Sequence, residues 1–463
     1  MGARIATKGV FATAKMKTFP LLLFFLAIFL VGCGTVSESP QPTTPVANAG
    51  ADQVVFVNYQ CQLDGSASTG NLAAYSWNIK QLPAGVVAPA ITLSGKKAYF
   101  NPTATGTYEF SLELSNSLGV STDEVRITVV PFSAPSIEAG FFGMCAHLNS
   151  HDGVAGGDID AMIAKMQDLG VEYVRFDFDW KEIEAADDIF TFSVYDNILT
   201  KLEAAGIKVL GILDYLNTWS NPTDGNATEI NRFADFALNT VRHFKGRIKY
   251  WQVWNEPNNE IFWGKAPNAV NYTLLLKAAY SAAKQGDPAA AVLIGGLVGN
   301  GIDEFIYMSG STPITFAAKN YLSDVYAAGG KDYFDVAAIH PYISATDISL
   351  TASLEAAISA TKALMAGNGD ASKEVWITEL GPLFFPPVAI DPISSKGYTE
   401  SEVAGWLSLI YGNLKGKVDS LFWYELRDYP GGLSILNPNW EGLVQSGGSP
   451  KAAYNAYKDL AKP

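Results

Sequence analysis

The sequence predicts an α/β protein in which a closed (β/α)8 barrel follows a small all-β, immunoglobulin-like sandwich. Three observations support this fold class. From Gly140 onward, short apolar runs alternate with longer segments whose apolar residues recur at helical spacing. Before Pro131 the runs are short, mostly of period two, and separated by Gly, Asn and Asp. The 463 residues are too many for one ordinary domain and sufficient for two.

The barrel domain is expected to span residues 140–463. Eight apolar runs are predicted as its strands: Phe141–His147, Tyr173–Phe178, Ile207–Leu213, Ile248–Glu256, Val292–Leu297, Phe334–His340, Val375–Glu379 and Leu421–Leu426. Helices are predicted at Ile159–Leu169, Asp196–Ala205, Asn231–His243, Asn271–Lys284, Ser349–Met365, Glu402–Leu414 and Ala452–Leu460. A doubly wound sheet is the rival arrangement, but the Gly-rich dinucleotide loop that usually follows its first strand does not occur.

The all-β domain is expected to span residues 46–130, with residues 131–139 as a linker. Its candidate strands are Val54–Val57, Ala74–Ile79, Tyr108–Leu114 and Val125–Val129. Cys61 has no second cysteine within this segment, so the domain must be stabilised by packing without an inter-sheet disulfide.

Composition excludes several classes of function. The net charge of −14 and pI near 4.8 provide no basic patch for nucleic acid. The three cysteines, Cys33, Cys61 and Cys145, lack metal-ligand spacing, and no His-x-x-x-His site is expected among the four histidines. We therefore expect neither a metal nor another cofactor.

The N-terminus has the pattern of a targeting segment. Lys15 and Lys17 precede an apolar run, Phe19–Val31, that is too short for a comfortable membrane span. The closing LVGC resembles the lipobox of bacterial lipoproteins, which implies lipidation of Cys33; in an ordinary signal peptide Cys33 would be incidental. Residues 1–33 are thus predicted as the signal, with Met16 as the start. Residues 34–45, rich in Ser, Thr and Pro, form a solvated tether.

The chemistry-bearing residues stand where two predicted strands stop. One strand ends in Trp254-Asn255-Glu256-Pro257, because proline cannot extend a sheet. Another, EVWITELG, stops at Glu379. In a closed barrel, both carboxyl groups would project at the carboxyl edge of the strands. Cleavage of an acetal needs one acid and one base at a fixed separation, and this pair of glutamates provides both.

These motifs resemble those of clan A glycoside hydrolases, which are retaining enzymes. The match rests on WNEP and ITELG, while VRFDFDWKEIE on strand two and HPY on strand six point towards family thirty-nine and its exopolysaccharide-degrading relatives. The resemblance covers residues 140–463 and implies Glu256 as the acid/base, Glu379 as the nucleophile and Asn255 as a hydrogen-bond partner of the sugar 2-hydroxyl. If Glu256 instead only capped the next segment, it would have no catalytic role.

Further substrate-binding candidates surround this pair. Arg175 lies in an otherwise apolar strand and needs a partner, which we expect to be Glu379, although an ordinary structural salt bridge is the alternative. Tyr342, two residues after His340, could donate its hydroxyl to Glu379. His340 and His147 end strands and either line the pocket or are satisfied core residues.

Aromatic residues after the strands are candidate walls of sugar subsites. Trp423 on strand eight is expected to form the stacking floor, and the family resemblance implies a non-proline cis peptide bond after it. The other candidates are Asp214, Tyr215, Trp219 and Trp263, with local packing as the alternative for each aromatic. Asp177 and Asp179 follow Arg175 at alternate positions and are left outside the catalytic set.

The all-β segment has a resemblance of its own. PVANAGADQVV, LDGSAS, YSWNI and GTYEFSLELSNSLGVSTDEVRITV resemble a polycystic-kidney-disease-type (PKD) module. The resemblance implies Trp77 as its central core tryptophan, and a role as a spacer or as a weak glycan or protein binder.

Together these features predict a retaining glycosidase that is lipid-anchored in the cell envelope, monomeric, and active on a polysaccharide or oligosaccharide. The alternative is a non-catalytic glycan-binding or exopolysaccharide-assembly lipoprotein that uses the barrel as a scaffold. The loops at 302–323 and 383–398, which would form the subsites, match no motif.

Overall fold

The computed structural model describes residues 43–70, 74–138, 140–149, 159–299, 305–309, 312–317, 320–342, 347–381, 399–428 and 442–462. Residues 43–463 form one compact unit. The predicted signal with Met16 and Cys33, and most of the predicted tether, lie outside the described residues. Within the described ranges, no helix is long and apolar enough to cross a membrane.

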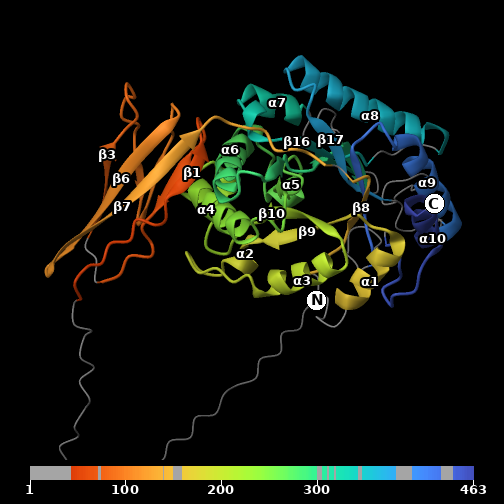
Figure 1. Ribbon diagram of the computed structural model, residues 1–463. Helices are drawn as coiled ribbons and strands as arrows, with labels where there is room; N and C mark the ends of the chain where they lie inside the picture. Colours follow the sequence, from red (N-terminus) through yellow and green to blue (C-terminus); the bar gives the residue numbers. More distant parts are fainter. Residues whose placement is uncertain are drawn as a thin grey trace, which may run out of the picture. The chain divides into compact units, whose positions relative to one another are not determined.

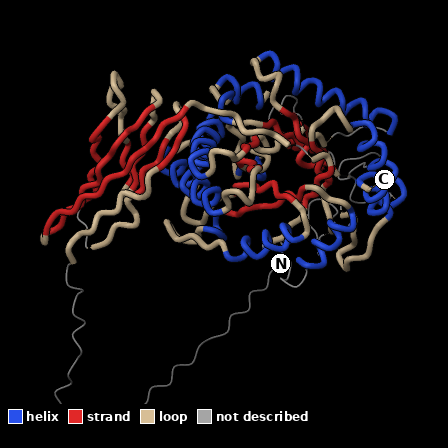
Figure 2. The backbone as a smooth tube through the Cα atoms, viewed as in Figure 1, coloured by secondary structure: helices blue, strands red, loops and turns tan. Residues whose placement is uncertain are grey.

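Parallel strands close into a barrel, as the sequence predicts (Figures 1 and 2). The strands are β8 (Phe142–Cys145), β9 (Tyr173–Asp179), β10 (Lys208–Asp214), β11 (Tyr250–Val253), β12 (Ala291–Leu293) with β13 (Leu297–Val298), β16 (Val336–His340), β17 (Glu374–Leu380) and β18 (Ser420–Trp423). β18 pairs with β8, and β12 and β13 both pair with β16, so the ring has no open edge. Figure 2 shows the strands as an inner ring inside the helices.

The predicted helices are present and pack around the strands. They are α1 (Ile159–Leu169), α3 (Ser193–Ala204), α4 (Ala227–His243), α6 (Ala269–Gly286), α8 (Asp347–Gly367), α9 (Glu400–Leu414) and α10 (Ala452–Ala461). The Asn226 side chain caps α4 by accepting from the N–H groups of Thr228 and Glu229. Sequence periodicity predicted the start of α4 at Asn231, four residues late. The first turn of α4 is mostly polar, so the Asn226 cap is the only local signal of its start.

Several short elements were not predicted. They are α2 (Trp180–Ile183), α5 (Glu260–Trp263), α7 (Tyr321–Ala327), the 3-10 turns Pro222–Asp224 and Lys331–Tyr333, and the hairpin β14 (Phe305–Ser309) and β15 (Thr312–Ala317). All of them follow barrel strands or precede the next one. Segments of one or two turns carry too little apolar periodicity to be recognised from sequence.

Residues 43–130, here called the N-terminal β-domain, form two sheets. One has the order β1 (Gln53–Phe56), β7 (Gly119–Val130), β6 (Gly106–Asn116) and β3 (Ala74–Gln81); the other is β2 (Cys61–Asp64), β5 (Lys97–Phe100) and β4 (Thr92–Ser94). Both sheets contribute to one core, in which Trp77 and the free Cys61 are buried. The smaller sheet was missed because its strands have only three or four residues.

A buried lysine joins the N-terminal β-domain to the barrel. Lys97 of β5 is 9% exposed, and its ammonium group binds Asp188 and, at 2.6 Å, Asp235 of α4. Gln62 also donates to Asp235 at 2.6 Å. Asp235 itself is 3% exposed, so its charge depends on these partners.

Replacement of this lysine should destabilise the protein. Lys97→Met keeps the aliphatic stem but leaves Asp235 buried without its cation, so we expect the free energy of unfolding to fall by about 3 kcal/mol. The matched control is Lys80→Met, which breaks the exposed pair with Glu124 and should cost less than about 1 kcal/mol. Urea unfolding followed by tryptophan fluorescence measures both. Equal stability of the two variants would contradict a stabilising role for the buried pair.

Candidate active site

Glu256 projects from a sharp change of direction after β11. Trp254 and Glu256 have positive φ angles of 69° and 44°, which costs non-glycine residues about 1 kcal/mol or more each. Hydrogen bonds hold this backbone: the Glu256 N–H donates to the Gly296 carbonyl at 3.1 Å. Asn259 donates to Glu256 Oε2 at 2.7 Å. The WNEP motif thus ends its strand by turning the carboxyl group inward.

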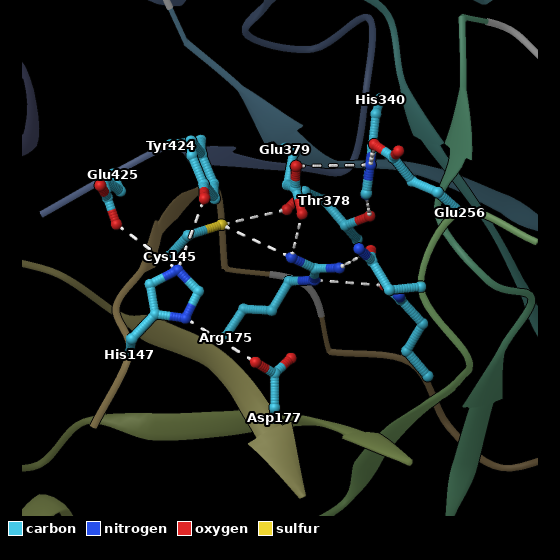
Figure 3. A network of polar contacts seen from close by, with 12 residues as sticks. Cys145, His147, Arg175, Asp177, Glu256, His340, Thr378, Glu379, Tyr424 and Glu425 are labelled. Atoms are coloured by element: carbon cyan, nitrogen blue, oxygen red, sulfur yellow. Dashed lines mark hydrogen bonds and ion pairs between the residues drawn. The ribbon is translucent and has the colours of Figure 1, made fainter. Parts of the chain in front are cut away.

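Arg175 of β9 connects three barrel strands at the centre of the site (Figure 3). Its guanidinium group donates to Glu379 Oε1 at 2.6 Å, to Asn255 Oδ1 at 2.7 Å and to Gln252 Oε1 at 3.3 Å. Arg175 is 4% exposed, so these acceptors replace its water shell. The structure therefore places Arg175 beside Glu379, where the sequence analysis expected it.

His340, at the end of β16, lies between the two glutamates. Its Nδ1 is 2.8 Å from Glu256 Oε1 and 3.5 Å from Glu379 Oε2, and its Nε2 is 3.0 Å from Thr378 Oγ1. Tyr342 donates to Glu379 Oε2 at 3.0 Å. One oxygen of each glutamate and a ring nitrogen of His340 lie within 4.8 Å of one another. The two carboxyl groups therefore face the same small volume.

Burial gives these groups unusual proton affinities. Removal from water raises the pKa of Glu256 to about 7, although the Asn259 hydrogen bond and the Arg175 charge partly oppose the rise. Burial lowers the pKa of His340 to about 3, against the attraction of Glu379, so its imidazole is neutral at pH 7. A neutral imidazole has one N–H, so His340 Nδ1 can donate a hydrogen bond to the ionised Glu256 or accept one from its protonated carboxyl group, depending on the tautomer.

A second polar group adjoins Arg175 on the side of β8 (Figure 3). His147 is 3.7 Å from Asp177 and 3.5 Å from both Glu425 and the Tyr424 hydroxyl. Asp214 is fully buried, and its pKa is raised well above the usual range, first by burial and then by Asp177 and Asp179. Sequence reasoning missed Tyr424 and Glu425, although their position directly after an apolar strand was a usable signal.

Trp423 and Trp263 do not form the predicted sugar-binding surfaces, because both are fully buried. Trp423 lies 6.5 Å from Tyr411 of α9, whereas its neighbour Phe422 stacks 6.2 Å from Trp376. Successive strand side chains point to opposite faces, so Trp423 points outward, towards the helices. Trp263 packs in the core, 5.2 Å from the ring of Trp254.

The remaining aromatic candidates are half-buried. Tyr215 lies 5.8 Å from Trp254, and Asn255 is among its hydrogen-bond partners, which brings it to the site. Trp219 instead packs 5.5 Å from Trp180, in a local cluster with Arg232. The cis peptide bond expected after Trp423 lies one residue later, at Tyr424–Glu425, and a second one lies at Asp214–Tyr215.

Among the residues that the structure describes, two groups of side chains have the donor types and spacing for a metal ion: Glu256, His340 and Glu379, and Glu184, Asp188 and Asp235. In each group a protein cation already binds a carboxylate, Arg175 in the first and Lys97 in the second. A metal ion would be repelled by that charge, so the donor sets fit hydrogen-bonded ion pairs better than metal centres.

The parallel barrel with two glutamates at the ends of β11 and β17 defines a glycoside hydrolase of clan A. Residues 132–381 match the family model described as cellulase (glycosyl hydrolase family 5), and the chain therefore belongs to glycosyl hydrolase family 5. That match covers both Glu256 and Glu379. The sequence motifs had pointed to family thirty-nine of the same clan.

Solved structures share the fold at low sequence identity. A family 39 glycoside hydrolase from Bacteroides cellulosilyticus WH2 aligns with a TM-score of 0.54 and 20% identity, over 90% of this chain and 82% of that chain. A GH5_18 protein from Streptomyces cattleya in complex with GlcNAc aligns with a TM-score of 0.52 and 14% identity, over 71% and 80%. No curated protein matches the sequence significantly.

The protein should not tolerate a side chain at Gly296, which lies against the His340 imidazole. A Cβ at Gly296 would lie 2.0 Å from His340 Nε2, so Gly296→Ala must displace the imidazole and should cost about 2 kcal/mol or more. Gly412 lies inside α9 with nothing within 4 Å of an added Cβ, so Gly412→Ala should stabilise by about 0.5–1 kcal/mol. Thermal unfolding and turnover of an aryl glycoside compare the two. Full activity of Gly296→Ala would contradict the packing argument.

Proposed function

We propose that this chain is a retaining O-glycoside hydrolase that cleaves a polysaccharide or oligosaccharide by double displacement. Glu256 is the acid/base and Glu379 the nucleophile. The observation that carries the proposal is the separation below 4.8 Å between carboxylate oxygens of the two residues. Retaining enzymes hold their carboxyl groups about 5–5.5 Å apart, whereas inverting enzymes need about 6.5–9.5 Å to admit a water molecule.

In the first step, Glu379 attacks the anomeric carbon while the glycosidic C–O bond breaks and Glu256 protonates the departing oxygen. Arg175 and Tyr342 each donate to one oxygen of Glu379, which orients the carboxylate for attack. Burial keeps Glu256 protonated near neutral pH. The two environments thus suit two different roles for the same type of side chain.

In the second step, Glu256, now a carboxylate, takes a proton from water, and the water oxygen displaces Glu379 from the anomeric carbon. His340 is a positioning residue, because its contact at 2.8 Å fixes the Glu256 carboxyl group between the two steps. Asn255 is held by Arg175 through its Oδ1. Asn255 is also a hydrogen-bond partner of Tyr215, and its Nδ2 amide carries two N–H groups, so one of them can donate to the 2-hydroxyl of the sugar, a contact that strengthens in the transition state.

We extend the proposal to the substrate, the lipid anchor and the type of the N-terminal β-domain. The HPY motif and the strand-two motif support a functional likeness to family thirty-nine enzymes that act on exopolysaccharide. The LVGC motif supports lipidation of Cys33 and a location in the cell envelope, and the segment before Pro131 supports a PKD-type module. We propose that the enzyme acts as a monomer on a carbohydrate outside the cytoplasm.

Replacement of either glutamate should abolish turnover of a polysaccharide. Glu256→Ala removes acid/base assistance, which is worth about 10²–10⁴-fold in rate. The variant should keep part of its activity on aryl glycosides with good leaving groups, because these need little protonation. Glu379→Ala should be inactive on both substrates, and azide should restore turnover through the glycosyl azide of inverted configuration. Glu260→Ala, an exposed glutamate four residues after Glu256, is the control. Wild-type turnover by either catalytic variant would refute the assignment, and polysaccharide binding without product release by the unmodified chain would favour the non-catalytic alternative.

The pH dependence of activity should report Glu256. Its raised pKa means that it is protonated below about pH 7 and loses the proton above it. Because only the protonated form can donate in the first step, kcat/KM should fall as the pH rises through about 7. In Glu256→Gln, the residual activity on an activated aryl glycoside should lack this alkaline limb. A limb that persisted unchanged in the variant would assign the titration to another group.

A further inference from the structure

A cavity of about 610 Å³ lies where the N-terminal β-domain meets the barrel. One wall is the turn Val57–Tyr59 of the β-domain, and a second is the connecting segment with Phe132, Pro135 and Ile137. The third wall comes from the residues at the beginnings of β16 and β17. The carboxyl pair projects at the opposite ends of the parallel strands, so this cavity is separate from the active site. Its volume falls in the usual range for small-ligand sites.

Aromatic rings form the floor of the cavity. Tyr59 lies at the centre, 5.2 Å from Tyr280, 5.7 Å from Tyr333 and 5.4 Å from Phe132. Phe132 is 39% exposed and Tyr333 is half-buried, so apolar ring surface remains accessible. The C–H faces of sugar rings pack well on such surfaces, because both partners remove apolar area from water.

Carboxylates line the rim. Asp335 and Asp370 are committed to the fold: Asp335 binds Tyr280 at 2.9 Å and Lys284 at 2.8 Å, and Asp370 accepts from Tyr326 at 2.9 Å. Asp332 is exposed and Glu374 is half-buried, so both can accept hydrogen bonds from hydroxyl groups. The lining holds four carboxylates against one ammonium group, that of Lys373, so its net negative charge disfavours uronates and other anionic ligands.

Hydrogen bonds connect the two domains at the cavity and next to it. The Tyr59 hydroxyl donates to the Asp332 carbonyl at 3.2 Å, and the Gln62 N–H donates to Gln285 at 3.0 Å, while Gln285 donates back to the Gln62 carbonyl at 2.8 Å. Together with the buried Lys97–Asp235 pair, these contacts oppose rotation of the N-terminal β-domain relative to the barrel. A ligand would therefore bind without first ordering the two domains.

We propose that this cavity between the two domains is a second carbohydrate-binding site, which holds a neutral sugar chain by stacking on Phe132 and by hydrogen bonds to Asp332. The choice of a sugar chain as ligand rests on the proposed function, whereas the cavity does not. The N-terminal β-domain then contributes a wall of a binding site and is more than a spacer. Bound polymer would raise the local concentration of substrate at the enzyme.

Affinity electrophoresis of the full chain carrying Glu379→Gln tests this site without degrading the probe. The probes are soluble xylan, mixed-linkage β-glucan and galactomannan, with polygalacturonate as the anionic comparison. At least one neutral polymer should retard the protein. Phe132→Ala combined with Asp332→Ala should raise the dissociation constant for that polymer about tenfold. Leu118→Ala, which trims a 49% exposed side chain elsewhere on the β-domain, should change nothing.

In the active chain, the same pair of substitutions should raise KM for the retained polymer and leave kcat/KM for a small aryl glycoside unchanged. Absence of retardation by every neutral polymer, or equal retardation of the double variant and Leu118→Ala, would overturn the proposal. The two proposals fail separately: a chain that binds polymer through Phe132 but hydrolyses no glycoside would disprove only the catalytic one.

Discussion

The buried charge of Arg175 is the constraint on which the rest of the site depends. A guanidinium group without water needs acceptors on all sides, and here they come from Glu379, Asn255 and Gln252 on two other strands. Those acceptors fix where the ends of β9, β11 and β17 can lie relative to one another. The barrel thus holds the charge in place, and the charge aligns Glu379 and Asn255 at the carboxyl ends of the strands.

The difference between the two glutamates follows from this arrangement. Glu379 receives a full positive charge at 2.6 Å, whereas Glu256 receives an amide hydrogen bond and a neutral imidazole. Burial raises the pKa of Glu256, and the Asn259 hydrogen bond and the Arg175 charge oppose this rise only in part. His340 can approach so closely only because Gly296 has no side chain. A backbone position between β12 and β13 therefore controls the surroundings of the Glu256 carboxyl group, which follows β11.

The contact between the N-terminal β-domain and the barrel also depends on a buried charge that is paired with opposite charges. Its Lys97 is the cation for a group of carboxylates on the barrel, and Gln62 satisfies the remaining oxygen of Asp235. Neither domain could bury those groups alone without a large desolvation cost. The contact between the domains is therefore specific, because each domain supplies the hydrogen-bonding partners of the other.

Local patterns in the sequence were sufficient to predict the barrel, its long helices and the pair of glutamates, because periodicity and strand ends are local properties. It also placed Arg175 and Tyr342 beside Glu379, since a charge in an apolar strand needs a partner and strand alternation fixes direction. The outward direction of Trp423 and the burial of Trp263 became apparent only in the folded barrel. The same holds for the buried pair of Lys97 and Asp235, which are 138 positions apart. Which face of a strand points inward, and which distant charges meet, depends on barrel closure and domain packing, and no local pattern encodes either.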